Sequence, residues 1–255
     1  MPIKRYTVHD LPERRVHPRA APGHQHLQVA HATLSGVFES LHVVRQAAAD
    51  KDARGRLRDP EVDLLRSALI LAGAGLDAVI RRLARDALPN LLAVGSPQTA
   101  AHRAFKEQIR GEVRDKSPSD SWTRAILADD PRQAMIDVYV RERTQGSLQS
   151  EKDLKRIRQA LGITDTVIPD DRIAELRPFL TARNQVAHDL DIKDPGDETW
   201  GPRYSRTVTT VVKQCNLALS LSDSFVVAVS DALGGPPALG RPRKRASQET
   251  GPLNR

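Results

Sequence analysis

The amino-acid sequence predicts an all-α protein, a helical bundle with an extra N-terminal helix and a disordered C-terminal tail. Three observations lead to this prediction. Apolar residues recur at helical spacing in one segment after another, and no alternating strand pattern of useful length occurs. The chain has 255 residues, of which 39% are hydrophobic, which is enough to fill a core. Because only 4% are aromatic, that core must consist mainly of Leu, Val, Ile and Ala.

The first half of the chain is expected to hold two long helices. Residues 1–26 contain several prolines and are predicted to form an irregular basic leader. A helix should follow over residues 27–50, and after a charged break a longer one over residues 61–88, whose apolar residues cover more than one face. Gly73 and Gly75 lie inside the longer helix and cost about 1 kcal/mol each against Ala, so another helix is expected to approach closely there.

The second half is expected to hold more polar helices and a final apolar one, although Thr207 to Val212 is rich in β-branched residues. The expected helices cover residues 97–115, 119–144, 150–161, a segment opened by Pro169-Asp170-Asp171 that reaches His188, and 204–233. The chain is therefore divided into a leader (1–26), an N-terminal helix and linker (27–59), a helical domain (60–233) and a disordered basic tail (234–255).

The net charge of +7 is concentrated at the two ends of the chain. Residues 1–26 carry five basic and two acidic side chains, and residues 234–255 carry five basic and one acidic, so residues 27–233 sum to zero. General attraction to RNA phosphate is thus expected from the ends and from local clusters. The tail holds a basic run that is a candidate for weak nucleic-acid binding, with a solubilising tail as the alternative: Arg241, Arg243, Lys244 and Arg245.

Three polar side chains crowd onto about two turns of an otherwise apolar helix, namely Arg183, Asn184 and His188. A guanidinium binds a phosphate oxygen, and an imidazole moves a proton near neutral pH. Asn184, one turn before His188, can hold the ring or the substrate. None of the three requires a metal ion, so the cluster predicts metal-independent RNA cleavage.

The spacing of Arg and His is not specific by itself, because with this composition it should occur about once by chance. A second copy, Arg19 to His24, contains Pro22 and Gly23, which predict a turn or coil without fixed geometry. That copy is set aside. In the helical copy, five residues turn the chain by about 500°, so Arg183 and His188 point roughly 140° apart. Two such helices facing each other would close the gap.

The motif Arg183-Asn184-x-x-x-His188 resembles the signature of the HEPN superfamily, all-helical ribonucleases whose motif is Arg, a polar residue, a few spacers and His. Two further stretches are similar to the bacterial RiboL-PSP branch. Residues 64–78, in which Asp77 follows a small and apolar run, resemble its first core helix. Residues 146–150, followed by Ile157, Leu161, Gly162 and Ile163, resemble the short helix and turn before the motif helix. The resemblance covers about residues 60–230.

The resemblance implies an endoribonuclease that serves as a toxin or phage-defence effector and works as a homodimer with facing motif helices. The substrate's own 2′-OH would attack the adjacent phosphate, leaving a 2′,3′-cyclic phosphate and a 5′-OH end. His188 would assist proton transfer, Arg183 would hold the phosphate and Asn184 would position the two. Asp77 is expected to orient an active-site group, or alternatively to form a structural ion pair with Arg66, Arg81 or Arg183.

The sequence also fits two other functions. The chain could be a non-catalytic helical module that recognises a nucleotide, a nucleic acid or a partner protein. It could also be silenced by an antitoxin or another defence-system partner, for example a nucleotidyltransferase that modifies a hydroxyl such as that of Tyr204. Without the resemblance, His188 would be interpreted as a surface histidine at a helix end and Arg183 as an ordinary ion-pair partner.

No cofactor and no metal ion are expected. Four histidines have irregular spacing and no accompanying cysteine: His17, His24, His26 and His31. Cys215 lies in an apolar pattern and is expected to be a buried small hydrophobe. The N-terminus lacks the apolar run of a signal peptide, and no segment approaches 18 uncharged apolar residues, so a cytoplasmic protein without a membrane span is expected.

Overall fold

The computed structural model describes residues 4–49, 57, 59–94, 99–114, 118–148, 150–194 and 202–235. Within these ranges the chain forms nine α-helices and no strand, which confirms the predicted all-α class. An isolated bridge pairs Ile192 with Arg203. The helices are α1 (Ala21–Ala49), α2 (Asp59–Val94), α3 (Ala100–Arg114), α4 (Asp120–Ile126), α5 (Pro131–Gln145), α6 (Glu151–Ala160), α7 (Asp170–Ala174), α8 (Arg177–Asp189) and α9 (Val208–Ala232). The predicted tail lies outside the described residues from residue 236 onward.

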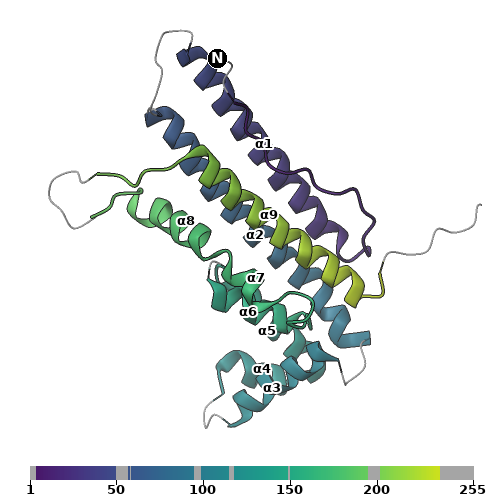
Figure 1. Cartoon of the computed structure of the whole chain (residues 1–255). Coiled ribbons are helices and arrows are strands. Elements are labelled where there is room, and N and C mark those ends of the chain that lie inside the picture. The colour runs from purple at the N-terminus through teal and green to yellow at the C-terminus, as the bar shows by residue number, and fades with distance from the viewer. Residues whose placement is uncertain are drawn as a thin grey trace, which may run out of the picture.

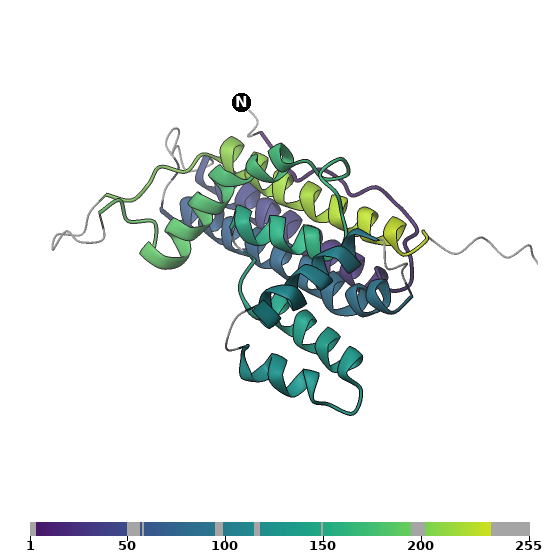
Figure 2. The same ribbon diagram turned by 90° about the horizontal axis from the view of Figure 1, so that it is seen from below.

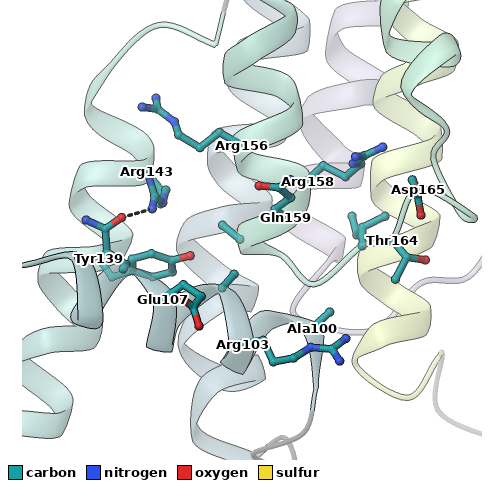
Figure 3. A pocket seen from close by; sticks show the side chains of 15 residues that line it. Ala100, Arg103, Glu107, Tyr139, Arg143, Arg156, Arg158, Gln159, Thr164 and Asp165 are labelled. Carbon is teal, nitrogen blue, oxygen red and sulfur yellow. Dashed lines mark hydrogen bonds between the residues drawn. The ribbon is translucent and has the colours of Figure 1, made fainter.

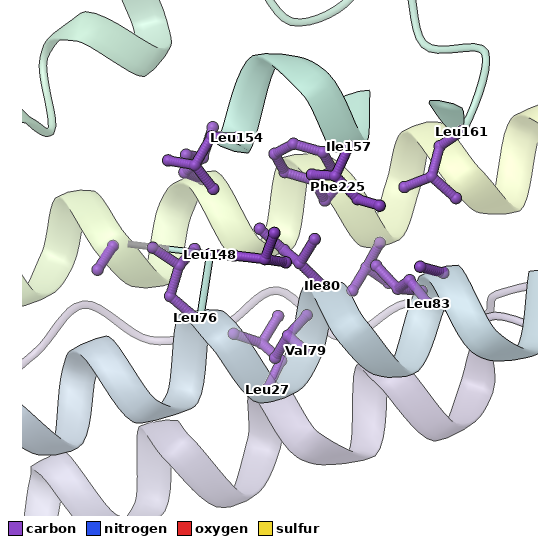
Figure 4. Close-up of a cluster of buried hydrophobic side chains, with 14 of the residues drawn as sticks. Leu27, Leu76, Val79, Ile80, Leu83, Leu148, Leu154, Ile157, Leu161 and Phe225 are labelled. Carbon is purple, nitrogen blue, oxygen red and sulfur yellow. The ribbon is translucent and has the colours of Figure 1, made fainter. Parts of the chain in front are cut away.

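Three long helices form the body of the molecule. Helix α2 packs against both α1 and α9, running antiparallel to α1 and parallel to α9 (Figures 1 and 2). Shorter helices surround this body: α3, α5, α6 and α8 pack on α2, whereas α4 packs on α5 and α7 packs on α6 (Figure 1). Buried side chains from these layers meet in one core, among them Leu27, Ile80, Ile157 and Phe225 (Figure 4). Each such side chain contributes about 1.5–3 kcal/mol by leaving water.

Helix α1 is part of this core and begins earlier than predicted. It starts at Ala21, so the predicted irregular leader of residues 1–26 is too long by six residues. Pro22 stands in the first turn, where the backbone nitrogen needs no helical partner. His24 is therefore helical, and the coil predicted for the second Arg–His copy is wrong at that residue. Leu34 and Phe38 are fully buried against the bundle, so α1 is an integral helix of the bundle and not an appended element.

The leader itself is fastened along α9. The backbone N–H of His9 donates to Asn216 at 2.8 Å, and that of His17 donates to the hydroxyl of Ser230 at 2.8 Å. Arg14 forms an ion pair with Asp223 at 2.9 Å. These contacts satisfy polar groups of a segment that has no secondary structure of its own.

Two predicted helices are each divided in the structure. The predicted helix 119–144 breaks between α4 and α5, because Asp130 caps α5 by accepting a hydrogen bond from the backbone of Gln133 and Pro131 opens the new helix. The predicted motif helix breaks after α7, and α8 restarts with Pro178 in its first turn. The motif thus lies on a helix of 13 residues.

The last helix starts later and the second one ends later than predicted. Thr207 accepts a hydrogen bond from the backbone of Thr210 and caps α9, which therefore begins at Val208 and not near residue 204. The β-branched run that follows Thr207 is helical. Helix α2 continues through Pro89 to Val94, beyond the predicted end at residue 88.

The two glycines of α2 do mark close approaches. A Cβ built on Gly75 would lie 2.6 Å from the Cβ of Ala30 on α1, which is too short for two non-bonded carbon atoms. A Cβ on Gly73 would lie 3.1 Å from the Cγ of Arg183 on α8. Glycine at these positions lets α1 and α8 pack tightly against α2, as the sequence predicts.

Candidate functional site

Arg183 is half-buried between α8 and α2. Its stem passes over Gly73, and its guanidinium donates to the side-chain oxygen of the neighbouring Asn184 at 3.0 Å. Burial lowers the pKa of Arg183, and the negative charge of Asp77 works in the opposite direction. The guanidinium still carries its charge near neutral pH, because arginine titrates far above that range. Arg183 and Asn184 therefore form one polar unit at the surface of the core.

Asp77 supports this unit from α2. Its carboxylate pairs with Arg81, one turn further along α2, at 3.0 Å and accepts the backbone N–H of Leu148 at 2.8 Å. The structural ion pair anticipated for Asp77 is present, with Arg81 as the partner. Through Leu148, the same carboxylate fixes the turn that leads into α6, so Asp77 ties two elements together beside Arg183.

His188 lies apart from the other two motif residues. It is exposed in the last turn of α8, and its imidazole makes no hydrogen bond within the described ranges. Arg183, five residues earlier, faces α2 instead. The structure thus brings Arg183, Asn184 and Asp77 together and leaves His188 directed to solvent, in keeping with the divergence that helical geometry predicts.

The end of α8 is held by the buried carboxylate of Asp191, a role that the sequence did not predict. Leu190 and Asp191 both adopt left-handed backbone conformations, with φ of 50° and 66°. The backbone N–H of Asp191 donates to the carbonyl of Gln185 at 2.9 Å and closes the helix end. The fully buried carboxylate of Asp191 binds Arg66 of α2 and Arg206 before α9. His188 consequently sits three residues before a fixed anchor.

The charges around this anchor favour the protonated state of Arg66. Burial alone lowers the pKa of Arg66, but its hydrogen bonds and Coulombic attraction to Asp191 and Asp63 outweigh burial, so the pKa is raised. Arg206 adds a hydrogen bond to the side chain of Gln185 at 2.9 Å. No local sequence pattern predicts this anchor, because Arg66 lies 125 positions before Asp191 in the chain.

A hollow of about 480 Å³ adjoins the end of α8. It lies between α2 and α8, and apolar side chains such as Leu71, Val186 and Leu190 line it together with charged ones such as Arg66 and Arg203. Leu190 is 63% exposed and Leu71 is 36% exposed, which is unusual for leucines that neighbour each other in one hollow. The motif helix therefore ends beside an uncovered apolar surface.

Of the other residues considered in the sequence, Cys215 and Tyr204 lie within the described part of the structure, and the basic run of the tail does not. Cys215 is buried, as predicted, and burial raises the pKa of its thiol to about 12, so it stays protonated and unreactive. Tyr204 is partly exposed and stacks on Arg206 at 5.5 Å. The basic run of Arg241, Arg243, Lys244 and Arg245 lies outside the described residues.

Comparisons of the chain with models of known protein families, with curated proteins and with solved structures found no match. Among the described residues, none of the helices has the length and apolar character needed to cross a membrane. In the same ranges, no three or more His, Cys, Asp or Glu side chains gather in a way that could hold a metal ion.

Proposed function

We propose that this protein is a metal-independent endoribonuclease and that α8 carries its active site. The observation that supports this most directly is the placement of Arg183, Asn184 and His188 on one short helix. Arg183 is oriented by Asn184 and packed on α2, while His188 is accessible to a substrate. The resemblance of this motif to that of HEPN ribonucleases points to the same activity, and with it to a role as a toxin or phage-defence effector.

In the proposed reaction the substrate supplies its own nucleophile. The 2′-hydroxyl attacks the adjacent phosphorus, the bond to the 5′-oxygen of the next nucleotide breaks, and a 2′,3′-cyclic phosphate remains. His188 transfers a proton to or from one of the two oxygens, the general acid–base role that an imidazole commonly performs near neutral pH. Arg183 stabilises the negative charge that builds on the phosphate. DNA lacks the nucleophile and is not cleaved.

A homodimer completes the proposed site. Because Arg183 faces α2 and His188 faces solvent, one chain presents them to different sides of α8. A two-fold axis beside α8 places the His188 of one subunit near the Arg183 of the other. The uncovered hollow with Leu190 supports contact between copies at this place, since burying exposed leucines favours association.

The test is cleavage of mixed RNAs by the purified chain in the presence of EDTA. We expect wild-type protein to produce 2′,3′-cyclic phosphate ends, and His188→Ala and Arg183→Ala each to lose cleavage while keeping the helical circular-dichroism spectrum. The chain offers a matched control, because His24 also follows an arginine by five residues and lies on a helix. His24→Ala should cleave as wild type does.

Two outcomes contradict the proposal. Cleavage that persists in both the His188→Ala and the Arg183→Ala variant places the chemistry elsewhere. If the wild-type protein binds RNA but does not cleave it, even at raised protein concentration, a non-catalytic binding module with the same fold is favoured.

A further inference from the structure

A second hollow, of about 630 Å³, lies away from the motif helix, between α3, α5 and α6 and the turn that follows α6 (Figure 3). Its volume falls in the range of pockets that bind small molecules, which is about 300–1,000 Å³. Four guanidinium groups line it, against only two carboxylates, those of Glu107 and Asp165. The arginines are Arg103, Arg143, Arg156 and Arg158.

Arg143 is held in this hollow by neutral groups. Its guanidinium lies 4.8 Å from the centre of the Tyr139 ring, and Tyr139 is almost fully buried. It donates to the side-chain oxygen of Gln108 at 2.6 Å (Figure 3). Within the described ranges no carboxylate lies within ion-pairing distance of Arg143, and its Nε is buried without an acceptor. A partly desolvated cation in this position favours a bound anion.

The other arginines divide into two kinds. Arg158 is nearly buried and already pairs with Asp170 at 2.9 Å, and Arg156 pairs with Asp153 at 3.1 Å. Arg103 is exposed on α3 and forms no ion pair with any described carboxylate. Arg143 and Arg103 are thus the two cations of the hollow that have charge to offer to a ligand.

Gly111 on α3 also lines the hollow. Glycine weakens a helix relative to alanine, so a glycine inside one usually has a packing reason. Here the described residues supply none, because a Cβ on Gly111 would meet none of their atoms within 4 Å. The absent side chain keeps the hollow open on this side. Gly36 on α1 has equally open surroundings but lies in no described hollow, which makes it a matched control.

We infer that this hollow binds a nucleoside monophosphate. The phosphate group would pair with the guanidiniums of Arg143 and Arg103, which prefer bidentate contacts to such groups. The hollow is much larger than a phosphate ion, and small or apolar side chains such as Ala104, Ala160 and Ile163 offer a wall for the nucleoside. Binding here requires no RNA cleavage and does not rest on the proposed active site.

Isothermal titration calorimetry of the full chain with 5′-AMP, 5′-GMP, adenosine and inorganic phosphate tests this inference. At least one of the nucleotides should bind at least about tenfold more tightly than either adenosine or phosphate. Arg143→Ala should weaken that binding at least about tenfold. Arg82→Ala is the charge control, because Arg82 is an exposed arginine of α2 that pairs with Asp86 outside the hollow. It should bind as wild type does.

The glycine pair tests the location independently of charge. Gly111→Leu should fill the hollow and weaken nucleotide binding at least about tenfold, whereas Gly36→Leu should leave it unchanged. Both variants should fold, since leucine favours helices and neither position is crowded. The inference is overturned if no probe binds at concentrations up to about 1 mM. It is equally overturned if Arg143→Ala or Gly111→Leu binds the nucleotide as tightly as its control.

Discussion

The Nε of Arg66 lies 2.9 Å from the carboxylate of Asp191, 125 positions further along the chain, and Asp191 is fully buried. The same arginine also binds Asp63 at 2.7 Å, but the Asp63 side chain is 56% exposed. One guanidinium thus has a buried and an exposed partner. The effect of burial on the strength of an ion pair can therefore be measured by comparing the Arg66–Asp191 pair with the Arg66–Asp63 pair.

Asp191→Ala should destabilise the protein by about 3–5 kcal/mol, because it removes the buried carboxylate of two arginines and leaves Arg66 with only its exposed partner Asp63. Asp63→Ala removes an exposed partner of the same arginine and should cost less than about 1 kcal/mol. Urea denaturation followed by circular dichroism gives both values. Equal losses in the two variants would contradict the anchoring role of Asp191.

The close approach of Gly75 and Ala30 leads to a second prediction. Gly75→Ala should destabilise the protein by about 1–3 kcal/mol, because the new methyl group would force α1 and α2 apart. Gly36→Ala, at an open position of α1, should instead stabilise it by about 0.5–1 kcal/mol. Thermal denaturation of both variants is the measurement. The double variant Gly75→Ala/Ala30→Gly should recover part of the loss, and its failure to do so would show that the contact is not the cause.

Glu142 gives a prediction about pH. Burial raises the pKa of Glu142 above its ordinary value of 4.5, the hydrogen bond from Trp122 opposes this shift, and the charge of Glu112 adds to it. The folded state therefore holds the proton more tightly than the unfolded state. The stability due to this group is present below the unfolded pKa and is lost as pH rises through the folded pKa.

Glu142→Gln should accordingly raise the melting temperature at about pH 7 and have little effect at about pH 4. The amide oxygen of glutamine can still accept the hydrogen bond from Trp122, which is 2.8 Å long in the wild type. Glu39→Gln, which alters an exposed residue paired with Arg5, is the control and should show no such difference. A gain that is the same at both pH values would contradict this assignment of the pKa.

Periodicity predicts the fold class and the approximate position of most helices, because both depend on which face of a helix is apolar. It places boundaries less well, since these depend on single capping contacts such as those of Asp130 and Thr207. The motif helix and the packing glycines of α2 could also be found in the sequence. The anchor at Asp191 could not, because its partners Arg66 and Arg206 meet it only after the chain has folded.

The homodimer proposed above predicts the effect of a charge at the end of α8. Leu190→Asp should prevent dimerisation, because it replaces an exposed leucine, which contact between two copies would bury, with a carboxylate that is costly to desolvate. The variant should fold, since Leu190 has a φ of 50° and aspartate tolerates this left-handed conformation better than leucine does. Light scattering should show that the variant is a monomer, and the variant should lose RNA cleavage together with the dimer.

Leu127→Asp is the matched control for this variant. Leu127 is 79% exposed and follows α4, so the substitution adds the same charge at an exposed leucine away from α8. It should leave both the oligomeric state and cleavage unchanged. Wild-type specific activity should also fall on dilution below the dimer dissociation constant, because each site of the proposed dimer would need residues from two chains. A monomeric Leu190→Asp protein with full activity per chain would rule out a shared site.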